Sequence, residues 1–175
     1  SLINKAKKND FMCEIATNDA FSEIIECLLD TEIRQKFNYG LTVRDLEMAL
    51  ELLGEESFRL YICRDGTGEI ASSRIVISVP GLEGFRIDIG QDSTGEIRSS
   101  KTVIRVPGFR AIDWVAGTKR EYLSSGATQL LIWHALTDLW QHGATGFDFA
   151  GANLSSVSAA KADWGGKLMP YYIVR

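Results

Sequence analysis

The chain has 175 residues, 45% of them hydrophobic and 24% charged, and its formal net charge at pH 7 is −4. This length suits a single domain, residues 1–175, with a sizeable buried core. The acidic balance argues against broad, nonspecific binding of nucleic acid. No apolar run approaches the ~20 residues that span a bilayer, and no signal-peptide pattern opens the sequence. We therefore expect a cytoplasmic protein without a membrane span.

The three cysteines, Cys13, Cys27 and Cys63, are widely spaced and form no C-x-x-C pair. An odd number of scattered cysteines suits buried thiols in a reducing compartment better than disulfides or a zinc site. We therefore expect no bound metal. The first residue is Ser1 rather than methionine, which is consistent with a processed chain or a part of a longer one.

Two amphipathic helices are predicted in the first third of the chain. Residues 17–30 place their apolar side chains on one face, with Thr17 or Asn18 as the N-cap. Residues 43–53 have the same pattern, with Thr42 as the N-cap and a glycine as the stop signal.

An alternating apolar pattern begins at Ser57 and predicts a series of strands, which are expected at about 57–63, 69–79, 84–90, 95–106 and 109–116. Apolar residues nearly encircle a predicted helix over 125–142, so we expect that helix to be largely buried. A strand at 146–150, a short helix at 154–163 and a strand at 167–174 complete the chain. This order predicts an α/β (α+β) fold with a mixed, mainly antiparallel sheet flanked by helices.

The sequence repeats itself with a period of 27 residues. The first copy, residues 65–81 (DGTGEIASSRIVISVPG), recurs as the second copy, residues 92–108 (DSTGEIRSSKTVIRVPG), with 12 of 17 positions identical. Two copies are too few for a solenoid, so the repeat indicates a duplicated β-hairpin. The extra hairpin could lengthen the sheet, project from it, or pair with a second molecule as a homodimer. We predict that the original core survives and that the second copy projects or exchanges.

The most specific motifs lie in the last thirty residues. The segment from Gly146 to Gly151 (GFDFAG) predicts a strand and a sharp turn, and the segment from Lys161 to Gly166 (KADWGG) predicts the end of a short helix with a double-glycine break. With the strand 109–116, these segments resemble the C-terminal domain of FemABX-type acyltransferases, a branch of the GNAT (N-acetyltransferase-like) superfamily. The resemblance covers nearly the whole chain outside the duplicated unit.

The resemblance implies a GNAT-like fold and an N-acyltransferase activity. Family members move an acyl or aminoacyl group from acyl-CoA or aminoacyl-tRNA to an amine, typically in cell-envelope precursors. It also implies an N-terminal GNAT-like domain that is missing from this chain. The alternative is a catalytically inert GNAT-like module for binding or assembly, in which the duplicated hairpin mediates dimerisation.

A donor site follows from the same resemblance. The donor would lie along the strand 109–116, with its phosphates on backbone amides at the start of the next helix. The residues so implicated are Trp114, Val115, Lys119, Arg120, Ser124, Ser125, Gly126 and Ala127. The usual R/Q-x-x-G-x-G/A loop falls at 122–127, where only the last small residues fit, so a plain helix cap is an equal alternative.

Two residues are the candidate catalytic groups. Lys161 matches the lysine of the family's closing helix, where it would face a phosphate or the reacting carbonyl; the alternative is an exposed helix lysine. Asp148 points away from the phenylalanines on either side of it, so it could act as a general base or an amine anchor. Its alternative role is to cap the turn at 152–156.

The remaining polar candidates have simpler interpretations. We expect His134 to be a core histidine and His142 to favour the C-terminal end of its helix as a cation. Asn153 is predicted to be a helix N-cap. The four tryptophans are most simply core residues.

Overall fold

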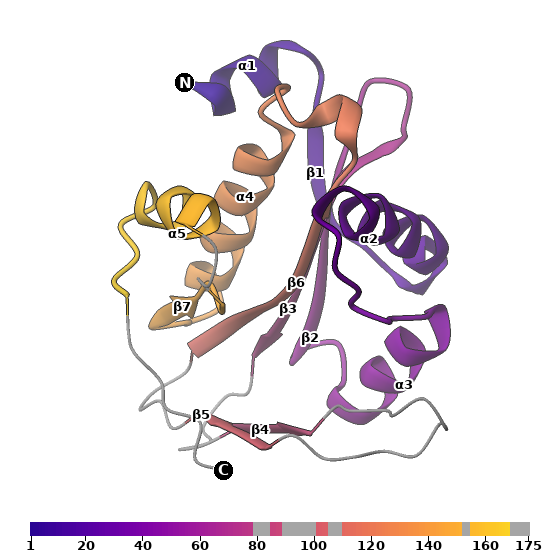
Figure 1. Cartoon of the computed structure of the whole chain (residues 1–175), viewed down its shortest axis with the longest axis vertical. Helices are drawn as coiled ribbons and strands as arrows, with labels where there is room; N and C mark the ends of the chain where they lie inside the picture. Colours follow the sequence, from indigo (N-terminus) through magenta and orange to yellow (C-terminus); the bar gives the residue numbers. More distant parts are fainter. Residues whose placement is uncertain (79–84, 89–100, 105–109, 152–154, 169–175) are drawn as a thin grey trace.

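A five-stranded sheet with helices on both faces forms the centre of the fold (Figure 1). The computed structural model describes residues 1–78, 85–88, 101–104, 110–151 and 155–168. Its helices are α1 (Leu2–Lys8), α2 (Phe21–Gln35), α3 (Val43–Leu53), α4 (Ala127–Gln141) and α5 (Ser155–Ala162), with 3₁₀ turns η1 (Asn18–Ala20) and η2 (Arg120–Tyr122). Its strands are β1 (Met12–Ile15), β2 (Phe58–Arg64), β3 (Ile70–Ser78), β4 (Phe85–Asp88), β5 (Lys101–Ile104), β6 (Arg110–Thr118) and β7 (Gly146–Asp148).

The main sheet has the strand order β1-β2-β3-β6-β7. All neighbours are antiparallel except β6 and β7, which are parallel. The predicted class, a mixed and mainly antiparallel sheet flanked by helices, is therefore confirmed. Among the described helices, none has the length and apolarity to cross a membrane.

Among the described strands, the second copy of the repeat contributes none to the main sheet. Strand β3 lies in the first copy and pairs directly with β6. Strand β5 lies in the second copy and pairs only with β4, in a separate two-stranded sheet drawn apart from the main one in Figure 1. The residues that the duplication adds therefore lie in the connection between β3 and β6, and these two strands remain neighbours in the sheet.

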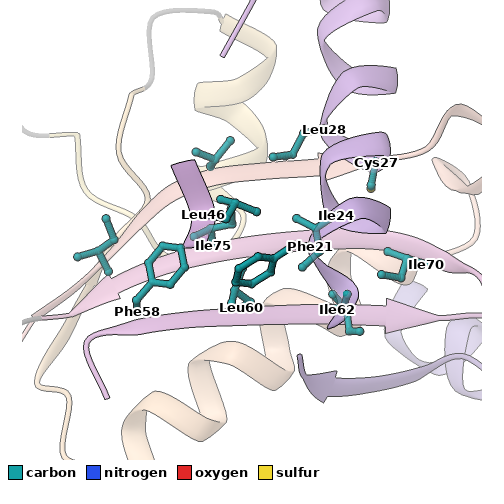
Figure 2. Close-up of a cluster of buried hydrophobic side chains, with 13 residues drawn as sticks. Phe21, Ile24, Cys27, Leu28, Leu46, Phe58, Leu60, Ile62, Ile70 and Ile75 are labelled. Atoms are coloured by element: carbon teal, nitrogen blue, oxygen red, sulfur yellow. The ribbon is translucent and has the colours of Figure 1, made fainter. Parts of the chain in front are cut away.

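Helices α2 and α3 cover one face of the sheet. Figure 2 shows Phe21, Ile24 and Leu28 of α2 directed at the strands, where Phe58 and Ile75 meet them. The apolar period of α2 supplies this face, and each side chain named here is at most 2% exposed. Full burial of such a side chain stabilises the fold by about 1.5–3 kcal/mol.

Helices α1 and α4 form a second core on the opposite face, and α5 lies on the same side (Figure 1). Strand β2 contributes to both cores, because Leu60 and Ile62 face α2 while Tyr61 and Cys63 face α4. The alternation predicted for this strand is therefore correct in period, with both faces covered.

Helix α3 has the predicted bounds because its signals are local. Thr42 and Asp45 form a reciprocal capping box at its start, and Gly54 ends it. Helix α2 differs from the prediction, since Asn18 to Ala20 form a 3₁₀ turn and the helix begins at Phe21, four residues after the predicted start. Thr17 and Asn18 therefore do not cap α2.

Helix α4 is less buried than predicted. It ends near Gly143, whose positive φ of 88° fits the expected left-handed position. Trp133 and Trp140, however, are 51% and 75% exposed, because only one face of α4 contacts the sheet. Helix α1 and strand β1 were not predicted, since each is too short to show a clear period.

Gly117 sets the distance between β6 and α2. A Cβ at this position would lie 2.8 Å from the carbonyl oxygen of Cys27, a backbone atom that cannot turn aside. We expect Gly117→Ala to reduce the free energy of unfolding by about 1–3 kcal/mol through overpacking. Urea denaturation measures the loss, and Gly66→Ala is the control because its Cβ would meet its nearest neighbour at 3.6 Å. Equal stability of the two variants would contradict this packing account.

Candidate functional site

Strands β6 and β7 run side by side for only three residues. Arg110, Ala111 and Ile112 pair with Gly146, Phe147 and Asp148. Strand β7 then ends, while β6 continues to Thr118. From Asp113 onward, β6 therefore has no pairing strand on this side within the described part of the chain.

A β-bulge coincides with this divergence. Strand β6 pairs with β3 at Val115↔Ile75 and next at Asp113↔Val76, so Trp114 is the extra residue. A bulge of this kind re-aims the neighbouring side chains. Trp114 joins the α2-side core against Phe58, while Asp113 shares the α4 side with its partner Val76.

A buried ion pair lies at the bulge. Arg74 pairs across the strands with Tyr61, which belongs to the α4-side core, so Arg74 and Asp113 share one face of the sheet. Arg74 Nη1 donates a hydrogen bond to Asp113 Oδ2, and each side chain is 7% exposed. The other carboxylate oxygen, Asp113 Oδ1, is also buried and has no hydrogen-bond partner among the described residues.

The electrostatics of Asp113 are set by opposing effects. Burial raises the pKa of its carboxyl group, and the nearby Asp148 adds to this rise. Arg74 and Lys161 act in the opposite direction, and the net result is a raised pKa. A carboxyl group with a raised pKa holds a proton more tightly than an exposed aspartate does, and its unpaired oxygen is free to accept one.

Lys161, on α5, orders the turn that follows β7. Its Nζ donates to the carbonyl oxygens of Phe149 and Ala150, at 2.5 Å and 3.3 Å, and to that of Gly151. An ammonium group can donate three hydrogen bonds, and three carbonyl oxygens of this turn accept them. Burial lowers the pKa of Lys161, although Asp113 and Asp148 oppose that effect. Lys161 is thus half-buried rather than an exposed helix lysine.

Asp148 also acts on this turn. Its Oδ1 accepts a 2.7 Å hydrogen bond from the amide of Ala150, which has a positive φ of 54°. This contact is a local bond between residues two apart. The predicted capping of the turn at 152–156 falls largely outside the described residues. Lys161 and Asp148 therefore come together from two elements and hold one turn beside Asp113.

The loop before α4 is held by side chains and by α1. Ser125 Oγ accepts from the amide of Ala127, the first residue of α4, at 3.0 Å, while the N-cap position itself is Gly126. Lys5 Nζ donates to the carbonyl of Ser124 at 2.7 Å. A Cβ on Gly126 would lie 2.1 Å from the carbonyl oxygen of Leu2, so only glycine fits beneath α1.

The two basic residues of this loop differ in their contacts. Lys119 Nζ forms a 2.5 Å ion pair with Glu69. Burial acts to lower the pKa of Lys119, but the hydrogen bond and the charge of Glu69 raise it, and the net result is a raised pKa. The backbone amide of Arg120 donates to Asp30 Oδ2 at 2.9 Å, and its side chain is exposed. The structure therefore brings Lys119 and Arg120 near the start of α4, with the charge of Lys119 already paired.

Comparison with known proteins shows what this architecture is. No family matches the sequence, and no curated protein matches it. Solved acetyltransferase structures do match. A possible acetyltransferase from Clostridium difficile 630 has a TM-score of 0.64 at 9% identity, over 94% of this chain and 95% of that chain. The chain has the GNAT fold.

Two further GNAT structures support this conclusion. A Trypanosoma brucei acetyltransferase has a TM-score of 0.62 at 11% identity, over 95% of this chain and 99% of that chain. An aminoglycoside 6'-N-acetyltransferase from Acinetobacter baumannii has a TM-score of 0.59 at 13% identity, over 94% of this chain and 95% of that chain. These likenesses establish the fold, and the predicted FemABX type stays a prediction.

The sequence predicts that a donor lies along the edge of β6, and this stays a prediction. Here, side chains on or just after α2 already occupy several polar groups of this edge. Thr31 Oγ1 accepts from the amide of Thr118 at 3.0 Å, and Arg34 Nη2 donates to its carbonyl at 3.4 Å. Tyr39 Oη donates to the carbonyl of Ala116 at 3.1 Å. A donor that used these groups would have to displace the side chains.

Trp114 and Val115 lie in the α2-side core rather than on an open surface. Val115 is 4% exposed, and Trp114 is half-buried against Phe58. Their direct contact with a donor stays a prediction. Arg74 was missed by the sequence analysis, although a single arginine within the apolar segment of β3 was a usable signal.

The two histidines lie away from the bulge. His134 packs edge-on against Tyr61, with Nε2 buried and without a partner among the described residues. His142 Nδ1 lies 2.8 Å from the carbonyl of Asp138, at the C-terminal end of α4. No group of three or more His, Cys, Asp or Glu side chains within the described ranges could hold a metal ion. The predictions for Asn153 and the strand 167–174 fall wholly or largely outside the described residues.

The first prediction from the site concerns the buried pair. Arg74→Met leaves Asp113 as an unpaired buried carboxylate, and we expect a loss of about 3–5 kcal/mol in the free energy of unfolding at pH 7. Adding Asp113→Leu should recover most of that loss, because the buried charge is then gone. Urea denaturation of both variants is the measurement. A double variant as unstable as the single one would contradict the ion-pair account.

The same variants predict a pH dependence. The folded pKa of Asp113 lies above its ordinary value, so its contribution to stability is complete below the ordinary pKa and is lost as pH rises through the raised one. The loss caused by Arg74→Met should therefore shrink as pH falls and Asp113 takes up a proton. A loss that stayed constant with pH would contradict this assignment.

The second prediction concerns the turn after β7. Lys161→Met removes the donor that three carbonyl groups share, and we expect a loss of about 1–3 kcal/mol in the free energy of unfolding. Lys167→Met is the matched control, because Lys167 is an exposed lysine on the same segment. Thermal or urea unfolding measures both. Similar losses in both variants would show that the contacts of Lys161 do not stabilise the turn.

Proposed function

We propose that the chain is an N-acyltransferase whose reacting groups meet beside Asp113. The observation that carries the proposal is the buried Asp113 carboxylate, with one unpartnered oxygen, at the point where β7 leaves β6. In a GNAT fold the donor's acyl group would lie at this divergence. The acceptor amine would approach the unpartnered oxygen.

The proposed chemistry is direct transfer. The amine nitrogen attacks the carbonyl carbon of the donor, the bond from that carbon to the carrier's sulfur or oxygen breaks, and the carrier leaves. Asp113 takes the proton that the amine loses. The charge of Arg74 lowers the pKa of Asp113 and so opposes the larger rise that burial causes.

Lys161 and Asp148 have supporting roles in this proposal. Lys161 is the electrostatic anchor, since its charge acts on Asp113 while its three donors order the turn after β7. One carboxylate oxygen of Asp148 already accepts a hydrogen bond from the Ala150 amide. We therefore propose Asp113, rather than Asp148, as the general base. Most of the rate enhancement would come from positioning of donor and amine.

The carrier in this proposal is acyl-CoA or aminoacyl-tRNA, and the acceptor is an amine, with cell-envelope precursors as the class that the FemABX resemblance suggests. The Acinetobacter protein of the same fold is, by its name, an aminoglycoside 6'-N-acetyltransferase. An acceptor screen should therefore include aminoglycosides, polyamines and lysine-containing peptides. The chain's net charge of −4 is compatible with cationic amines.

The test is calorimetric titration with acetyl-CoA and a long-chain acyl-CoA, followed by acyl transfer to the acceptor panel. We expect Asp113→Asn to retain donor binding and to lose transfer by about 10²–10⁴-fold, the usual contribution of a general base. Asp138→Asn is the matched control, because the Asp138 side chain is 14% exposed and also has an arginine partner, Arg59, on the same side of the sheet. Equal loss of transfer in both variants would contradict the role of Asp113.

The pH profile adds a second readout. The ionised carboxylate is the active form of the base, so the transfer rate should rise as pH increases through the raised pKa of Asp113. This rise should be absent in Asp113→Asn. A wild-type rate that does not change with pH across this range would contradict the proposal.

The second candidate function is an inert GNAT-like module for binding or assembly. A specific observation favours it: Thr31, Arg34 and Tyr39 already bond the polar groups at the β6 edge. Lys5 likewise holds the loop before α4. No binding of either acyl-CoA would support this function or an aminoacyl-tRNA donor, and titration with an aminoacyl-tRNA would separate those two.

A further inference from the structure

We propose that the β3 position, the place between β2 and β6, accepts either copy of the internal repeat. In the observed arrangement the first copy fills it with residues 70–78. In the second arrangement residues 97–105 would take the same place and the first copy would leave the sheet. The chain would thus interchange two arrangements of one core, independently of any catalytic activity.

The contacts of β3 support this proposal because the repeat preserves them. Ser72 Oγ donates to the carbonyl of Gly117 at 3.0 Å and lies 2.9 Å from the hydroxyl of Thr118. The second copy has a serine, Ser99, at the equivalent place. Four other β3 residues have identical equivalents, namely Ile70 with Ile97, Ser73 with Ser100, Val76 with Val103 and Ile77 with Ile104. Backbone pairing to β2 and β6 needs no particular side chain.

The cost of loop closure does not distinguish the two arrangements. With the first copy in place, the additional 27 residues of one repeat period belong to the connection between β3 and β6. With the second copy in place, the same number of additional residues would belong to the connection between β2 and the new strand. Loop-closure entropy depends on loop length, so this contribution is nearly equal on both sides.

Three buried positions decide which copy fills the sheet. Ala71 and Ile75 are fully buried and Ser78 is 1% exposed. The equivalent residues are an arginine, a threonine and another arginine, at positions 98, 102 and 105. Burial of these polar and charged groups without hydrogen-bond or ion-pair partners costs free energy, which explains why the first copy is the one observed.

The remaining substitution within the strand falls on the buried ion pair. Arg74 is the partner of Asp113, and its equivalent in the second copy is Lys101. Either copy therefore brings a cation to Asp113, although a lysine lacks the forked geometry of arginine. The positions that discriminate between copies are in the core, while the position beside Asp113 keeps its charge.

The test exchanges the three discriminating residues between the copies. The exchanged variant carries Ala71→Arg, Ile75→Thr and Ser78→Arg together with Arg98→Ala, Thr102→Ile and Arg105→Ser, so its composition equals that of the original chain. A control carries only the three first-copy substitutions. We expect the control to melt at least about 10 °C lower than the original chain. We expect the exchanged variant to regain most of that loss.

A disulfide reports which copy lies beside β2. Cys63 is directly opposite Ser72, and residues so placed in antiparallel strands lie ~4.5–5.5 Å apart at Cα, within the range that a disulfide spans. The reporter chains carry Ser72→Cys or Ser99→Cys, in a Cys13→Ser background because Cys13 is also opposite Cys63. Oxidised glutathione accepts the two electrons and leaves as two thiols. Peptide mass mapping identifies the bonded pair.

The outcomes separate clearly. In the original chain, Ser72→Cys should bond Cys63 at least about tenfold more than Ser99→Cys does, because the first copy is more stable there. In the exchanged variant this preference should reverse, and the disulfide should join two cysteines of the same molecule. An exchanged variant that stays as unstable as the control, or that bonds Cys63 only through position 72, would overturn the proposal. Bonding at position 99 between two molecules would also overturn it, in favour of exchange in a dimer.

Discussion

The bulge in β6 is the constraint on which the site depends. One extra residue, Trp114, turns that strand so that Trp114 and Val115 face α2 while Asp113 faces α4. Without the bulge, strict alternation would place Asp113 and Val115 on the same face of the sheet. The bulge thus converts one strand into a core surface on one side and a charged position on the other.

The charged position is costly and is placed where pairing stops. The side chains of Arg74 and Asp113 lose their hydration on the α4 side of the sheet. Burial raises the pKa of Asp113 by more than the charge of Arg74 lowers it. A pair of apolar residues would fill this space at lower cost. The ion pair lies at the end of the β6–β7 pairing, which is the place where we propose that the donor and the amine meet.

The sequence predicted the elements whose signals are local. Helix α3 was placed correctly because Thr42 and Gly54 mark its ends within the same short segment. The fold class followed from the order of helices and strands. Burial of α4 was overestimated, because the apolar residues Trp133 and Trp140 give no sign of which face the sheet will cover.

The candidate site could be predicted only in part, because its contacts join distant segments. Lys161 was singled out, but its three acceptors belong to a turn whose shape depends on where α5 packs. The pairing of Arg74 with Asp113 requires a register between strands that a 31-residue connection separates, residues 79–109. Nothing in a local pattern sets that register.

The central claim is that Asp113 is a buried proton acceptor beside a donor site. The most direct test is to follow its side-chain carboxyl carbon by NMR through a pH titration, with and without a non-hydrolysable acetyl-CoA analogue. The account predicts a pKa above the ordinary aspartate range and a change in that pKa when the analogue binds. A carboxyl group that titrates as an ordinary aspartate, unaffected by the analogue, would contradict it.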